Sequence, residues 1–186
     1  ELPLGGHEGS ISVHADGTTE YARFGPVGGS RPFGAGQVDT YPLKAVQFGP
    51  DGLPTDAAYK ALAEQAAGFE HQDPGTVRMN YFKTSEADTL ALDAWIARMK
   101  AASDRKQAPT YDVTRQNCAT FCIAGLIQSQ AIENSGISLI PNTLFELLAQ
   151  RAADNYPAPR KKPPAEDIQK SHRGCLISRE TGECVK

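Results

Sequence analysis

Hydrophobic and polar residues alternate near the start of the chain, in two runs that cover residues 7–14 and 18–24. Alternation with a period of two is typical of β-strands that bury one face. Asp16 and Gly17 lie between the runs, and both residue types tolerate positive φ. The pattern therefore predicts a β-hairpin.

Strand-like patterns give way to helical spacing further along the chain. Residues 37–48 favour one or two more strands, interrupted near Pro42, and residues 79–82 favour a short strand. Between these segments a helix is expected from Thr55, whose side chain can cap it, to Gly68, a left-handed stop.

Three more helices are predicted. The second begins at Ser85 and buries one stripe, formed at helical spacing by Leu92, Trp95, Ile96 and Met99. The third is expected over about residues 117–130, and the fourth starts with a capping box from Thr143 to Glu146. Strands followed by helices predict an α+β fold, in which an antiparallel β-sheet packs against helices.

Charge and proline content divide the chain into a domain and a tail. The last 31 residues carry seven Lys/Arg and four Asp/Glu, so 12 of the 19 basic and 18 of the 22 acidic side chains lie in residues 1–155. Prolines surround the basic run at residues 160–162, which favours an extended linker. We expect one domain at residues 1–155, and a solvated Pro- and Lys-rich linker with a C-terminal tail at residues 156–186.

Length and composition argue against several classes of protein. The 186 residues suit one domain, and 40% of them are hydrophobic. No run approaches the roughly 18 apolar residues of a membrane span. The net charge of −3 is not that of a polybasic nucleic-acid binder. The chain starts at Glu1 without a signal-like apolar run, so we expect a piece of a longer polypeptide.

The third predicted helix opens with the sequence NCATFC at residues 117–122. If Asn117 caps this helix, Cys118 is its first residue, where unpaired N–H groups and the helix dipole stabilise a thiolate and can receive an oxyanion. Cys122 lies one turn later among apolar neighbours and is interpreted as a packing residue. A zinc site would need two more ligands, which no nearby His or Cys supplies, so we expect no metal.

A cysteine nucleophile needs a base, and the chain has four histidines: His7, His14, His71 and His172. His14 adjoins the predicted turn, His71 lies in a polar loop and His172 lies in the tail. His7 has small neighbours in the sequence GGHEG, which leaves room for a substrate or a helix N-terminus. We therefore pair His7 with Cys118.

Two short motifs occur in a characteristic order: HEG at residues 7–9, and NCATF at residues 117–121. This order resembles that of circularly permuted papain-like enzymes of the NlpC type, which include the lecithin:retinol acyltransferase-like proteins. Residues 6–26 also look like toxin domains at the ends of bacterial secreted effectors. The resemblance covers roughly residues 5–130, and it implies a permuted papain-like catalytic domain within residues 1–155.

The resemblance implies a role for each candidate residue. Cys118 would be the nucleophile, His7 the general base, and a third polar residue would orient the imidazole. We favour Glu20 for this third role, because a carboxylate can hold the histidine tautomer. A two-residue hairpin, however, would place Glu20 opposite Val13, roughly 20 Å along the strand from His7. The other candidates for this role are Tyr21, Arg23, Gln37 and Asp39.

The resemblance also implies an antibacterial effector toxin, delivered by type VI secretion into target bacterial cells, with their periplasm as one compartment of action. It would be a cysteine hydrolase, an amidase or peptidase that forms an acyl-enzyme and needs no cofactor. Its partners would be a cognate immunity protein and a peptide, cell-wall or lipid substrate. No membrane-surface helix is evident, so an amidase is favoured over a lipid acyl hydrolase or acyltransferase.

Two other classes of function remain as alternatives. In a non-enzymatic binding domain, Cys118 would be a packed thiol and His7 a turn residue. A nuclease or nucleotide-modifying toxin is disfavoured, because residues 1–155 are acidic and show no His/Asp/Glu cluster suited to a metal. We therefore expect no nucleic-acid partner.

Cys175 and Cys184 bracket the sequence LISRETGE in the tail. Thr181 and Gly182 favour a turn within it, so a disulfide would close a short loop. An oxidising compartment such as the periplasm favours this disulfide, whereas in the cytosol both residues would be free thiols.

Overall fold

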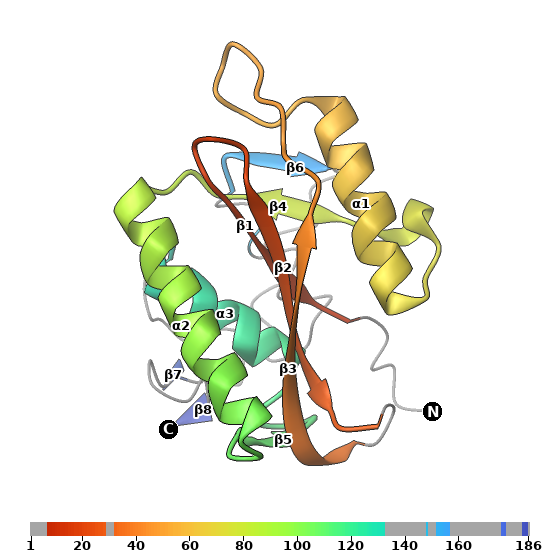
Figure 1. Ribbon diagram of the computed structural model, residues 1–186, viewed down its shortest axis with the longest axis vertical. Coiled ribbons are helices and arrows are strands. Elements are labelled where there is room, and N and C mark those ends of the chain that lie inside the picture. Colours follow the sequence, from red (N-terminus) through yellow and green to blue (C-terminus); the bar gives the residue numbers. More distant parts are fainter. Residues whose placement is uncertain are drawn as a thin grey trace, which may run out of the picture.

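A curled antiparallel sheet lies at the centre of the fold, with helices on both sides (Figure 1). The computed structural model describes residues 7–28, 32–132, 148, 152–156, 176–177 and 184–185. In this part of the chain, four strands form the main sheet in the order β1-β2-β3-β5, and each neighbouring pair is antiparallel. The predicted α+β class is confirmed.

The main sheet consists of β1 (Gly9–Val13), β2 (Thr19–Pro26), β3 (Phe33–Leu43) and β5 (Thr110–Asp112). Pro42 does not interrupt β3, contrary to the prediction. The Val27 N–H donates to the Ala35 carbonyl, so odd-numbered residues of β3 bond to β2. The nitrogen of Pro42 therefore faces away from β2, where no N–H is needed.

Two small sheets accompany the main one. β4 (Met79–Tyr81) pairs with β6 (Asp154–Tyr156), which confirms the short strand predicted there. β7 (Leu176–Ile177) pairs with β8 (Cys184–Val185). Cys175 lies outside the described residues, and so does the predicted disulfide.

The β1–β2 hairpin closes with a three-residue loop instead of the predicted two-residue turn. The His14 N–H donates to the Thr18 carbonyl at 2.9 Å, which leaves residues 15–17 in the loop. Gly17 has a φ of 86°, and its carbonyl accepts from the Val46 N–H at 2.8 Å. The additional loop residue shifts the strand register by one place.

The helices are α1 (Asp56–Glu70), the 3-10 helix η1 (Pro74–Thr76), α2 (Glu86–Asp104) and α3 (Cys118–Gln128). Side chains of Thr55, Ser85 and Asn117 cap α1, α2 and α3, as predicted. α1 ends two residues later than predicted, because His71 and not Gly68 takes the left-handed conformation, with φ of 54°. Its N–H reaches two carbonyls of the last turn.

The fourth predicted helix, from Thr143, lies outside the described residues except for Leu148, which is helical and buried. Most of the predicted linker and tail, residues 156–186, also lies outside them.

The side of the sheet that faces α2 and α3 forms the hydrophobic core. The predicted stripe of α2 is buried: Leu92, Trp95, Ile96 and Met99. The Trp95 ring lies 4.8 Å from that of Phe121 on α3, and Phe121 lies 5.9 Å from Phe24 on β2. Each buried side chain of this size contributes roughly 2–3 kcal/mol. This packing fixes α3, and Cys118 at its start, against the sheet.

The opposite side of the sheet carries an aromatic stack that holds the end of α1. The ring of Phe69 on α1 lies 4.1 Å from Tyr41 on β3 and 6.2 Å from Tyr21 on β2. This stack places Glu70, the last residue of α1, near the start of β1.

Candidate functional site

His7 and Glu8 immediately precede β1, and their side chains lie on opposite sides of the strand. His7 Nε2 is 3.7 Å from Glu70 Oε2, on the α1 side. The charge of Glu8 instead acts on Cys118 and Cys122 of α3. Neighbouring residues of an extended chain point in opposite directions, which accounts for this division. The edge strand thus presents a histidine on one side and a carboxyl group on the other.

Cys118 is the first residue of α3, as the sequence predicts. Asn117 Oδ1 accepts from the Thr120 N–H at 3.1 Å, and Thr120 Oγ1 accepts from the Asn117 N–H at 3.0 Å. The backbone N–H groups of Glu8, Ala119 and Cys118 itself act on the Cys118 sulfur. Donors that converge in this way stabilise a thiolate or an oxyanion.

The resting state of Cys118 is nonetheless the neutral thiol. The residue is only 4% exposed, and burial raises the pKa of the thiol to about 11. The Glu8 carboxylate raises this pKa as well, while the backbone N–H groups lower it by less than burial raises it. The backbone N–H groups at the helix start therefore favour the thiolate as predicted, but burial outweighs their effect. The thiol needs a base to become a nucleophile.

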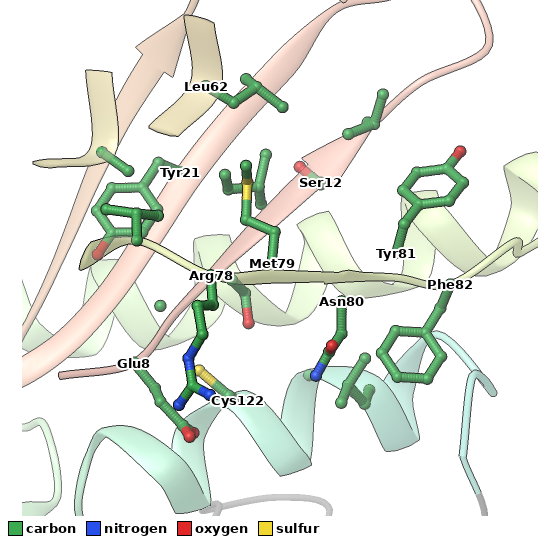
Figure 2. Close-up of a pocket in the computed structure, with 18 of the residues that line it drawn as sticks. Glu8, Ser12, Tyr21, Leu62, Arg78, Met79, Asn80, Tyr81, Phe82 and Cys122 are labelled. Carbon is green, nitrogen blue, oxygen red and sulfur yellow. The ribbon is translucent and has the colours of Figure 1, made fainter. Parts of the chain in front are cut away.

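Cys122 lies one turn further along α3 and is also buried. Burial raises the pKa of its thiol well above the ordinary value, and the Ser10 hydroxyl donates a hydrogen bond to the sulfur. Its burial confirms the predicted packing position. Figure 2 shows the sulfur beside Glu8 and Arg78 at one end of a cavity.

A carboxylate network surrounds His7. Glu70 accepts from the Tyr21 hydroxyl at 2.8 Å and from Arg23 Nη1 at 3.2 Å to each of its oxygens. Arg23 also bonds Asp39 Oδ2 at 3.2 Å through Nε and Nη2. Glu70 is therefore held in place from two sides, with one oxygen directed toward the His7 imidazole.

The His7 imidazole is neutral near pH 7. Burial lowers its pKa, Glu70 acts in the opposite direction, and the Arg23 charge lowers the pKa again. A neutral imidazole can accept a proton. Within the described residues, His7 Nε2 has no hydrogen-bond partner.

Gly9 has a steric role in this network. A Cβ atom at Gly9 would lie 2.2 Å from Cε2 of Tyr21, so only glycine lets the Tyr21 ring lie across β1. That position allows the Tyr21 hydroxyl to reach Glu70. The glycine of the HEG motif is thus explained by the packing of its cross-strand neighbour.

The structure brings the backbone of His7 to Cys118, but not its imidazole. The Glu8 N–H bonds toward the Cys118 sulfur, and His7 is joined to that nitrogen by one peptide bond. The imidazole faces Glu70 on the other side of the strand. Contact between the imidazole and the sulfur would require His7 to change its side-chain conformation.

Glu20 is not brought to His7. The hairpin register pairs Glu20 with Ser12, five residues along the strand from His7, or roughly 17 Å. Two of the other candidates, Tyr21 and Arg23, contact Glu70.

The two remaining candidates lie further out. Gln37 Nε2 donates to Asp39 Oδ1 at 2.6 Å, and Asp39 bonds Arg23. Asp39 and Gln37 thus support the network through Arg23 and do not contact His7 themselves.

Sequence reasoning missed Glu70 and Glu8. Glu70 lies 63 positions from His7, and no local pattern indicates their contact. Glu8 lies within the HEG motif, so its alternation with His7 along the strand was an available signal. Burial raises the pKa of Glu8 to about 8, although the Arg78 charge lowers it.

A cavity of about 550 Å³ runs along β1, between that strand and the segment that contains β4. His7, Glu8, Glu70 and Cys122 are among its lining residues. Figure 2 shows Tyr81 and Phe82 at the end far from Glu8.

The other histidines lie elsewhere. His14 bonds Glu86 at 2.9 Å and Asp93 at 2.8 Å, and His71 ends α1. His172 is outside the described residues.

No cluster of three or more His, Cys, Asp or Glu suited to a metal occurs in the part of the chain that the structure describes. None of the helices described there has the length and apolar character of a membrane span.

The candidate site of this α+β fold thus consists of a buried cysteine at the start of α3, next to the edge strand β1 of the antiparallel sheet. No protein-family model and no curated protein matches the chain. Among solved structures, the chain is similar to the crystal structure of the type VI secretion system effector TseH, with a TM-score of 0.54. The two are 16% identical over 96% of this chain and 86% of TseH, so the fold is what they share.

Proposed function

We propose that this protein is a cysteine hydrolase with a circularly permuted papain-like arrangement, in which Cys118 is the nucleophile and His7 the general base. The observation that carries the proposal is the position of Cys118 as the first residue of α3, where backbone N–H groups, including that of Glu8, lower the pKa of the thiol. One of these groups is joined directly to His7. The bond cleaved is an amide or peptide bond.

The reaction would begin when a bound substrate draws the His7 imidazole toward the sulfur, since catalytic hydrogen bonds often form fully only in the substrate complex. Neutral His7 takes the thiol proton, and the sulfur attacks the carbonyl carbon. The carbonyl oxygen becomes an oxyanion that the N–H groups at the start of α3 receive. The C–N bond breaks, and the amine leaves with the proton from His7. Water activated by His7 then hydrolyses the thioester.

Glu70 takes the third role, which the sequence analysis gave to Glu20. In the conformation that the structure shows, its carboxylate lies 3.7 Å from His7, so Glu70 orients the imidazole before substrate draws the ring toward the sulfur. Tyr21 and Arg23 act through Glu70, so they are positioning residues. The low exposure of Glu70, 14% of its side chain, strengthens its electrostatic effect on His7 in this conformation.

We infer further that the hydrolase is an antibacterial effector toxin, delivered by type VI secretion into other bacterial cells. The likeness in fold to TseH and the sequence resemblance of residues 6–26 to effector toxin domains support this role. A cognate immunity protein would then protect the producing cell, and the periplasm of the target cell would expose cell-wall peptides to cleavage.

A non-enzymatic binding domain is the competing function. The burial and raised pKa of the Cys118 thiol, and the orientation of the His7 imidazole toward Glu70, favour it. A lipid acyl hydrolase is the other alternative, favoured by apolar residues in the cavity wall such as Leu62 and Met79.

Expression of the protein in the periplasm of a bacterial host tests the proposal. We expect growth arrest and new cell-wall peptide fragments by mass spectrometry, and we expect Cys118→Ala and His7→Ala to abolish both. His14→Ala is the matched control, because this second histidine pairs with Glu86 and Asp93 and does not line the cavity, and the variant should remain toxic. Full toxicity of Cys118→Ala would refute the hydrolase proposal and favour a non-enzymatic binding domain.

A further inference from the structure

Within the described residues, β1 is an edge strand whose outer side has unpaired backbone groups. The His14 N–H bonds the Thr18 carbonyl, and the register continues to Val13 opposite Thr19. In an antiparallel pair, hydrogen-bonded residues alternate, so the even-numbered residues of β1 bond to β2. The N–H and C=O groups of the odd-numbered residues, Gly9, Ile11 and Val13, therefore point away from the sheet.

The outward groups of β1 face the 550 Å³ cavity, because Gly9, Ile11 and Val13 belong to its lining. Gly9 is exposed, and Ile11 and Val13 are half-buried, so the edge is open to a ligand. In the described part of the chain, β4 pairs with β6 and not with β1. The cavity is thus bounded on one side by a row of unpaired backbone donors and acceptors.

Two residues of the cavity lining, Ser12 and Glu8, have buried polar atoms. Ser12 is 2% exposed, and its Oγ has no hydrogen-bond partner among the described residues. Glu8 Oε1, near the Cys118 end, is likewise buried without a partner there. Neither atom is accessible from the cavity, so a ligand there would bond the outward backbone groups of β1.

We propose that the cavity binds an extended peptide chain, which adds to the free edge of β1 as a further strand. This inference rests on the proposed function and deepens it, because it names peptide chains as the substrate class. His7 and Glu8 precede β1 and both line the cavity, so a peptide along Gly9–Val13 leads toward these two residues. Strand addition of this kind uses main-chain hydrogen bonds for affinity.

Hydrogen bonding distinguishes a peptide from a lipid acyl chain. An acyl chain would cover the outward backbone groups of β1 without bonding them. Each buried group left unpaired costs about 1–3 kcal/mol. A peptide has N–H and C=O groups at the spacing of a strand, so it pairs with the same edge at no such cost.

The cavity walls set the side chains that such a peptide would carry. Side chains of an added strand alternate between the α1 side and the α3 side. The α1 side is largely apolar, with Leu62, Ala66 and Ala67, whereas Ser10 and Ser12 face α3. Figure 2 shows Leu62 and Met79 on one side of the cavity, and Cys122 on the other. We expect apolar residues to alternate with small polar residues.

Amide hydrogen exchange tests this inference without catalysis. The protein is the Cys118→Ala variant, and the probe is a mixture of acetylated hexapeptide amides in which Leu, Val or Phe alternates with Ser. We expect the amides of Gly9, Ile11 and Val13 to exchange at least tenfold more slowly with the peptides, and those of Ser10 and Ser12 to change less. Equal protection by sodium dodecanoate below its micelle concentration would overturn the inference in favour of an acyl chain.

Two controls place the peptide at the edge of β1. Ala66→Trp should fill the cavity and abolish the protection, whereas Ala57→Trp, at an exposed position of the same helix, should leave it unchanged. Two isomeric peptide sets, N-methylated at odd or at even positions, need no protein variant. Peptides of one set should no longer protect the outward amides of β1, whereas peptides of the other set should still protect them. Equal binding by both sets contradicts strand addition.

The outcomes also separate this inference from the proposed function. If the peptides bind along β1 and the wild-type protein cleaves none of them, the hydrolase proposal is refuted and the peptide-binding proposal stands. If the wild-type protein cleaves peptides but the amides of β1 are not protected, the hydrolase proposal stands and the peptide-binding proposal is overturned.

Discussion

Glu8 shows how strongly the position of one residue on a strand determines its chemistry. Its neighbour His7 faces Glu70, while Glu8 is half-buried beside two thiols, and the pKa of Glu8 rises to about 8. A carboxyl group whose pKa is raised by folding holds its proton in the folded state at pH values where the unfolded chain has lost it. Glu8 is therefore neutral or half-ionised over most of the physiological range.

Glu8→Gln should alter how stability depends on pH. Because folding raises the pKa of Glu8, its contribution is fully present below about pH 4.5 and is lost as pH rises through about 8. The loss amounts to at most about 5 kcal/mol. In urea unfolding at pH 5 and pH 9, Glu8→Gln should lose less stability between the two pH values than the wild type. An unchanged pH dependence would show that Glu8 is not buried as described.

Gly9→Ala should destabilise the protein, because the added Cβ would lie 2.2 Å from the Tyr21 ring. Overpacking of this kind costs about 1–3 kcal/mol. Gly25→Ala is the matched control, since nothing lies within 4 Å of a Cβ there on β2. Thermal unfolding of both variants measures the difference. Equal stabilities would contradict the placement of Tyr21 across β1.

At the scale of elements, the start of α3 is the part of the site that the sequence predicts best. The NCATF motif gives both the cap and the position of Cys118, because capping depends on residues three apart in the chain. The hairpin was predicted with a register shifted by one place, since three loop residues, and not two, lie between His14 and Thr18. Glu70 could not be found, because its contact with His7 depends on how α1 packs on the sheet.

Asn117→Ala tests the coupling between this cap and the cysteine. Loss of a side-chain cap costs about 1–2 kcal/mol, and it loosens the first turn of α3 that directs N–H groups at the sulfur. We expect a lower melting temperature and slower alkylation of Cys118. Ser85→Ala removes the corresponding cap of α2. It should lower the melting temperature similarly and leave the alkylation rate unchanged. Equal alkylation rates of Cys118 in the two variants would show that the Asn117 cap does not control the reactivity of the thiol.

At the scale of the whole molecule, the sheet separates the two halves of the proposed machinery. α3 packs on one side with the sulfur, and α1 brings Glu70 to the other (Figure 1). The two halves meet at the outer edge of β1, where the chain passes from His7 to Glu8. The α+β class followed from the order of strands and helices, whereas this meeting at an edge depends on the three-dimensional packing of distant segments.

The central claim is that His7 is the base that activates Cys118 once substrate draws its imidazole to the sulfur. The pH profile of Cys118 alkylation by a peptidyl chloromethyl ketone, which occupies the substrate site, tests this claim most directly. The modified peptide is quantified by mass spectrometry in the wild type and in His7→Ala. We expect the wild-type rate to rise through the pKa of His7, which burial lowers below 6.5, and the variant to react appreciably only as pH approaches the thiol pKa of about 11. Identical profiles in the two proteins would contradict the account.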